Sequence, residues 1–104
     1  MALAIFEDYS QTIEGTNHAP FIVDISSIQC YDKLLKWVKE NHFEDIQPMK
    51  DYLEIFAKKE GFEYTFRVDD EKGNALVNAS VYGKRGRTRK KLIQLLAELV
   101  KYFS

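Results

Sequence analysis

The sequence predicts a single α+β domain with elements roughly in the order ββααββα, and three observations lead to that prediction. The chain has 104 residues, a common size for one domain. Hydrophobic residues make up 45% and charged residues 30% of it, a balance typical of globular proteins. The hydrophobic period changes along the chain from helical spacing to strict alternation and back. We therefore expect an antiparallel or mixed sheet with helices packed on one face, all within residues 1–104.

The first 47 residues are expected to supply one or more strands and one helix that complete the fold. Residues 15–20 are rich in turn formers and predict a loop, whereas residues 21–25 form a β-branched run that predicts a strand. Ser26 or Ser27 can cap a helix that Asn41 would end. The apolar positions of this helix are spaced for one face: Ile28, Tyr31, Leu34, Leu35 and Val38.

A second helix is expected to begin at Pro48, because proline suits the first helical position, and to end at Gly61. Glu54 and Lys58 form an i,i+4 pair on it. Its apolar positions would be Met49, Tyr52, Leu53, Phe56 and Ala57.

The last third of the chain predicts a hairpin followed by a helix. Residues 62–68 and 75–82 alternate in polarity as half-buried strands do, and the polar residues 69–74 between them predict a turn. Thr88 can cap a terminal helix with a continuous apolar stripe. That stripe consists of Leu92, Leu95, Leu96, Leu99, Val100 and Phe103.

Several classes of function find no support in the residues. Cys30 is the single cysteine, so the chain has neither an internal disulfide nor a thiolate zinc site of its own. His18 and His42 have no nucleophile or acid in a catalytic pattern. We expect no enzyme activity, cofactor, metal or small-molecule substrate. No apolar run approaches the roughly 20 residues of a membrane span, and the beginning of the sequence has no basic leader, so we expect a cytoplasmic location without membrane contact.

The most informative feature is the basic segment, residues 84–91. The overall net charge of −1 hides −5 in residues 1–48 and +4 in residues 49–104. Six of the cations lie within these eight positions: Lys84, Arg85, Arg87, Arg89, Lys90 and Lys91.

The position of the basic segment is electrostatically unusual. A helix N-terminus carries about half a positive charge, so acids normally occupy the first turn and cations the last. Here Arg89, Lys90 and Lys91 would occupy the first turn. A bound anion would make that arrangement favourable, and Gly83 and Gly86 would allow close approach of the backbone. A solvated face, or pairing with the acidic N-terminal half of the chain, explains the pattern equally well.

Residues 48–103 also resemble a divergent double-stranded RNA-binding domain, as an α-β-β-α portion. The similar motifs are Pro48 followed by Leu53-Glu54, the strand beginning at Tyr64, and the glycines, threonine and Lys90-Lys91 pair before the last helix. The resemblance implies that Lys90 and Lys91 contact phosphates and that Glu54 corresponds to a minor-groove contact. We therefore expect a protein that recognises double-stranded or structured RNA by backbone and shape, with all six cations of the basic segment in contact with phosphates. Glu54 with Lys50 or Lys58 would form a second, weaker line of contact.

A protein-interaction module is the alternative. The terminal helix has more apolar side chains than one core contact needs, and residues 7–45 are acidic. A homodimer, an adaptor or an inhibitor would use these two surfaces.

Overall fold

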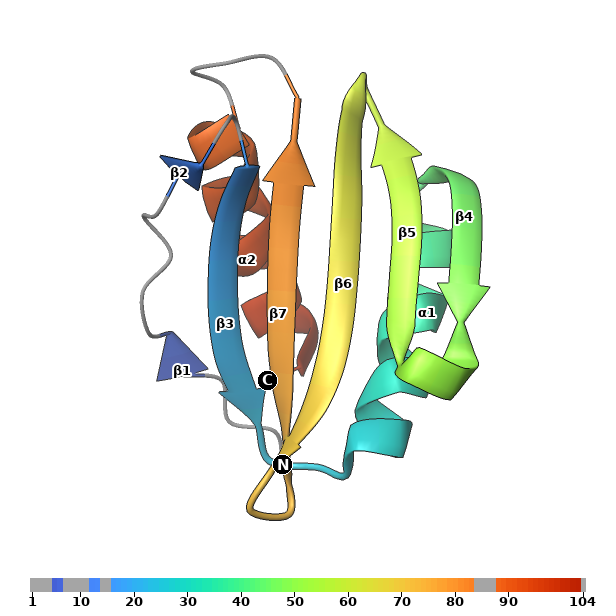
Figure 1. Cartoon of the computed structure of the whole chain (residues 1–104), viewed down its shortest axis with the longest axis vertical. Helices are drawn as coiled ribbons and strands as arrows, with labels where there is room; N and C mark the ends of the chain where they lie inside the picture. Colours follow the sequence, from blue (N-terminus) through green and yellow to red (C-terminus); the bar gives the residue numbers. More distant parts are fainter. Residues whose placement is uncertain (1–4, 7–11, 14–15, 84–87, 104) are drawn as a thin grey trace.

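One antiparallel sheet forms a layer of the molecule, and two helices cover one of its faces (Figure 1). The computed structural model describes residues 5–6, 12–13, 16–83 and 88–103, with the backbone alone for 5–6, 12–13, 16–20 and 88–89. The strand order is β1-β3-β7-β6-β5-β4, and β2 pairs with β3. The predicted α+β class, single domain and placement of helices on one face are confirmed.

The bounds of the elements are as follows. The strands are β1 (Ile5–Phe6), β2 (Thr12–Ile13), β3 (Thr16–Val23), β4 (Glu44–Met49), β5 (Glu54–Lys59), β6 (Phe62–Glu71) and β7 (Asn74–Tyr82). The helices are α1 (Ser27–Glu40), the short 3-10 helix η1 (Lys50–Tyr52) and α2 (Thr88–Phe103).

Helix α1 lies where the sequence predicts it. The Ser26 side chain accepts a hydrogen bond from the Gln29 backbone N–H at 3.3 Å, which satisfies one of the free donors at the helix start. Asn41 ends the helix, and both its backbone N–H and its side-chain amide donate to the Trp37 carbonyl. Ile28 is 59% exposed and so does not join the core, although it has the helical spacing of a core residue.

Helix α2 is also confirmed, and it begins at Thr88, inside the basic segment. Of its six predicted apolar positions, five are buried and Val100 is half-buried. The helix packs on β3 and β7, whereas α1 packs mainly on β6 and β7.

The β6–β7 hairpin has the predicted strands and a tighter turn than the polar run 69–74 indicates. The two strands pair from Glu63↔Tyr82 to Glu71↔Asn74, so that only Lys72 and Gly73 remain between them. Both turn residues have positive φ angles, 54° and 89°, as a type I′ turn requires. The right-handed twist of the strands favours this turn.

The predicted helix from Pro48 to Gly61 is wrong. This stretch contains the end of β4, then η1, then β5, which pairs with β6 from Glu54↔Arg67 to Lys59↔Phe62. Gly61 is the second residue of a two-residue hairpin turn, because it and Glu60 both have positive φ angles, 83° and 53°. The described elements therefore follow the order β1-β2-β3-α1-β4-β5-β6-β7-α2, with strands where the second helix of ββααββα was expected.

The predicted loop at residues 15–20 is also wrong for residues 16–20. These residues form the first part of β3, which pairs with β7 along its whole length, from Thr16↔Tyr82 to Val23↔Ala75. Pairing with β7 provides hydrogen-bond partners for the backbone N–H and C=O groups of these residues. This gain outweighs the local preference of Asn17 and Pro20 for turns.

The core lies between the sheet and the two helices. Alternate residues of β5, β6 and β7 point into it, among them Ile55, Phe66 and Val77. The intervening residues of these strands lie on the other side of the sheet, which we call the open face. Within the part of the chain that the structure describes, neither helix covers it (Figure 1).

Candidate functional site

The basic segment lies between β7 and α2, and the structure describes only part of it. Lys84, Arg85 and Arg87 fall outside the described residues, and Arg89 is helical with only its backbone described. Lys90 is exposed on the first turn of α2, and this turn contains no acid. The predicted meeting of cations with a helix N-terminus is therefore present at Lys90.

Lys91 forms an ion pair with another residue of the chain. Its ammonium donates to the Glu60 carboxylate at 3.0 Å and lies 5.5 Å from the centre of the Phe62 ring. The hydrogen bond and charge of Lys91 lower the pKa of Glu60. One cation of the basic segment thus pairs with an acid of the same chain, although this acid lies outside the acidic residues 1–48.

Gly83 also has a structural reason to be glycine. A Cβ atom at this position would overlap the Phe62 ring, over which the Lys91 ammonium also lies. The sequence suggested that Gly83 allows an anion to approach the backbone closely. In the structure the Phe62 ring occupies the space next to Gly83.

We expect Gly83→Ala to lower the free energy of unfolding by about 1–3 kcal/mol, because overpacking forces the Phe62 ring out of its position. Urea denaturation followed by circular dichroism measures the loss. In a Phe62→Leu background the same substitution should cost less, since the overlapping ring is gone. An equal cost in both backgrounds would show that another contact makes Gly83 necessary.

The predicted second line of contact does not assemble beside the basic segment. Glu54 begins β5 on the open face instead of lying on a helix, and Lys50 lies in η1 at the same end of that strand. Lys91 contacts Glu60 at the other end of β5, roughly 17 Å away for a six-residue strand. Lys50 pairs with Asp32 at 3.8 Å, and Lys58 lies 4.0 Å from Asp45.

The apolar surface that favours a protein-interaction module is mostly used by the core. Leu92, Leu95, Leu96, Leu99 and Phe103 are buried against the sheet, and the Tyr102 hydroxyl donates to the Lys33 carbonyl at 3.0 Å. Ile93 is the large apolar side chain of α2 that stays exposed, at 45%.

The residues with catalytic or metal-binding chemistry are dispersed. Cys30 is buried in α1, and burial raises the pKa of its thiol to about 12. His42 is exposed just beyond α1. Among the described residues, no three His, Cys, Asp or Glu side chains are placed to hold a metal ion.

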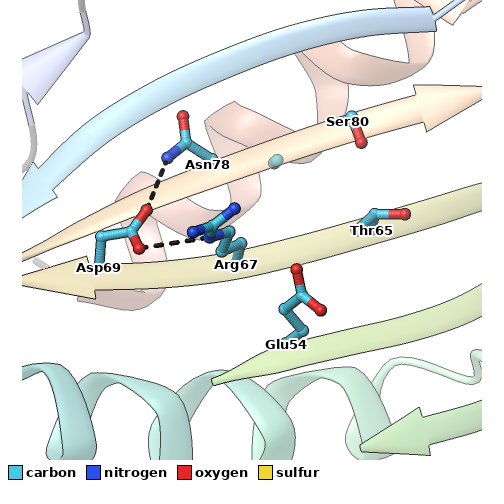
Figure 2. Close-up of a pocket in the computed structure, with 7 residues that line it drawn as sticks. Glu54, Thr65, Arg67, Asp69, Asn78 and Ser80 are labelled. Carbon is cyan, nitrogen blue, oxygen red and sulfur yellow. Dashed lines mark hydrogen bonds and ion pairs between the residues drawn. The ribbon is translucent and has the colours of Figure 1, made fainter. Parts of the chain in front are cut away.

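The feature that the sequence did not reveal is a groove on the open face. Two cavities of about 290 and 310 Å³ share the lining residue Thr65, and we call the two together the groove. Figure 2 shows the first, with side chains from β5, β6 and β7 on one side of the sheet. Its labelled lining residues are Glu54, Thr65, Arg67, Asp69, Asn78 and Ser80. The second is lined by Asp45, Gln47, Phe56, Lys58, Glu63 and Thr65, among others.

The groove has an organised set of polar contacts. The Arg67 Nε donates to the Asp69 carboxylate at 3.3 Å, and the Asn78 amide donates to the other oxygen of that carboxylate at 3.4 Å (Figure 2). Asp69 is thereby fixed between neighbouring strands. The only sequence signal for this arrangement is the run of polar residues that alternates with the core residues of β6 and β7.

The chain matches no family model, no curated protein and no solved structure. No helix in the described part of the chain is long and apolar enough to cross a membrane.

Proposed function

We propose that this protein binds nucleic acid without catalysis, through the basic segment, and recognises the backbone of double-stranded or structured RNA. The observation that carries the proposal is the concentration of six cations in eight positions, with α2 beginning among them and no acid in its first turn. Phosphates are the regularly spaced anions that such a cluster fits.

The start of α2 supports phosphate binding at Lys90. Free backbone N–H groups and the helix dipole both attract an anion at a helix N-terminus, and the exposed Lys90 ammonium adds its charge there. Lys91 contributes less to this proposal, because Glu60 already neutralises it. The resemblance of the segment to the phosphate-contacting element of double-stranded RNA-binding domains favours RNA as the ligand. Residues 48–60 do not form the helix of that family, so the proposal depends on the basic segment alone.

Lys90→Glu is expected to weaken binding to duplex RNA roughly tenfold, to a similar degree for all sequences, and to lower the salt slope by about one. The double variant Lys90→Glu/Lys91→Glu should weaken binding further. Fluorescence anisotropy with labelled duplex RNA and duplex DNA, at two salt concentrations, measures these effects. Tighter binding to RNA than to DNA is expected.

Lys72→Glu is the matched control, because Lys72 is an exposed lysine in the β6–β7 turn, at the end of the sheet away from the start of α2 (Figure 1). This variant should bind RNA as the wild type does. Absence of binding by the wild type at low salt would disprove the proposal. So would a Lys90→Glu variant that binds as tightly as the wild type while remaining folded.

A further inference from the structure

The groove lies on the face of the sheet opposite helix α2, and it differs from the basic segment in charge. Its lining side chains include four carboxylates and two cations, a net charge of −2. Helix α2, which begins inside the basic segment, packs on the opposite face of the sheet (Figure 1). A surface with excess carboxylates repels phosphates, so the nucleic acid proposed above is not its ligand.

The two cations of the groove already have acidic partners. Arg67 pairs with Asp69 at 3.3 Å, and Lys58 lies 4.0 Å from Asp45. Glu54 and Glu63 are the carboxylates that remain: each lies opposite one of these cations in the strand register, yet neither forms an ion pair among the described residues. Glu54 lines one cavity and Glu63 the other, so each part of the groove has one of these two negative charges.

Apolar and neutral polar groups lie with these carboxylates. Phe56 is half-buried on β5 and pairs in register with Thr65, the residue shared by both cavities. Thr65, Ser80 and Asn78 offer hydroxyl and amide groups that can both donate and accept hydrogen bonds. A complementary ligand therefore has positive charges spaced along it and an apolar group between them.

Addition of a strand at the sheet edge does not explain the groove. The edge strand β4 contains Pro48, a shift of register between Glu44 and Gln47, and a positive φ angle at Asp45. All three features obstruct pairing with a further strand. A ligand that contacts this face must use its side chains across β5, β6 and β7.

We propose that the open face binds a basic, extended segment of a protein partner, with lysine or arginine side chains at Glu54 and Glu63 and an apolar side chain against Phe56. Charge complementarity selects this occupant over a nucleic acid. Helix α2, where Lys90 would contact the nucleic acid, packs on the other face of the sheet, so the protein would hold a nucleic acid and a basic protein segment at the same time.

The experiment measures binding of a fluorescently labelled ten-residue peptide of alternating lysine and leucine, at moderate salt, by anisotropy. A peptide of alternating glutamate and leucine is the charge control, and one of alternating lysine and glycine is the apolar control. The lysine–leucine peptide should bind most tightly. Glu54→Gln and Glu63→Gln should each weaken the binding of this peptide about threefold, and together about tenfold. Glu40→Gln, which removes an exposed carboxylate at the end of α1, should have no effect.

Phe56→Ala tests the groove separately from its charge. This substitution should weaken binding of the lysine–leucine peptide and leave binding of the lysine–glycine peptide unchanged. The proposal is overturned if the glutamate–leucine peptide binds equally well, or if the double glutamine variant binds as the wild type does. It is also overturned if light scattering shows a dimer that Phe56→Ala dissociates, because a second copy would then occupy the face.

The two proposals fail independently. Lys90→Glu should leave peptide binding unchanged, and Glu54→Gln/Glu63→Gln should leave RNA binding unchanged. If the wild type does not bind RNA, only the proposed function of the basic segment is disproved.

Discussion

Phe66→Ala is expected to lower the free energy of unfolding by about 3–5 kcal/mol. Phe66 is completely buried on β6, and its ring lies 6.1 Å from that of Phe43 in an edge-to-face arrangement. The substitution removes a large apolar side chain from the side of the sheet that the helices cover, and leaves a cavity. Small domains are stable by only about 5–15 kcal/mol, so the variant should be marginally folded. Urea denaturation followed by circular dichroism measures the change.

Phe56→Ala is the matched control on the other side of the sheet. Phe56 lies on the adjacent strand, pairs in register with the neighbour of Phe66, and is half-buried on the open face. Because less apolar area is lost, its cost should be about 1 kcal/mol. An equal cost for the two substitutions would contradict the assignment of an open face, since Phe56 would then be covered as fully as Phe66.

The elements that the sequence predicts correctly are those whose pattern has one explanation. Helix α1 has a capping serine, one apolar face and a terminal asparagine, and all three signals agree. Strand β6 alternates strictly over its first seven residues, from Phe62 to Val68, which no helix can satisfy. In both cases local preference and tertiary packing require the same structure.

Residues 48–60 were predicted wrongly because their pattern has two explanations. Their apolar residues fit one helical face, but Ile55 and Ala57 also have the spacing of a strand, and these are the ones that are buried. Gly61 follows the charged Glu60, and such a glycine can either end a helix or form a type I′ turn. The pairing of β5 with the following strand β6 selects the turn. Tertiary pairing therefore overrides the helical pattern here.

The candidate sites differ in how far the sequence reveals them. The basic segment is visible as a run of like charges, but the pairing of Lys91 with Glu60 joins residues 31 positions apart and requires the fold. The groove was missed for a similar reason. Its residues look like the solvated side of half-buried strands, and only the shape of the assembled sheet makes a concave surface of them.

Alkaline pH is expected to destabilise the protein strongly, beginning near pH 9. Burial raises the pKa of the Cys30 thiol from 9.0 to about 12, and burial with the nearby charges of Glu60 and Glu98 raises that of Tyr64 from 10.0 to about 12. The folded protein holds both groups neutral, whereas the unfolded chain ionises them at their ordinary pKa values. Stability is therefore complete below about pH 9 and falls between pH 9 and pH 12, by about 1.4 kcal/mol per pH unit for each group that titrates.

Cys30→Ala separates the thiol from the tyrosine in this prediction. At about pH 8 the variant should be less stable than the wild type, because a buried sulfur is lost from the core. At about pH 11 the difference should shrink or reverse, since the variant has no thiol to ionise on unfolding. Urea denaturation under reducing conditions at several pH values measures both curves. If the free energies of unfolding of the variant and the wild type fall in parallel with pH, water reaches the Cys30 thiol in the folded protein. Helix α1 would then not exclude water from the core that it forms with β6 and β7.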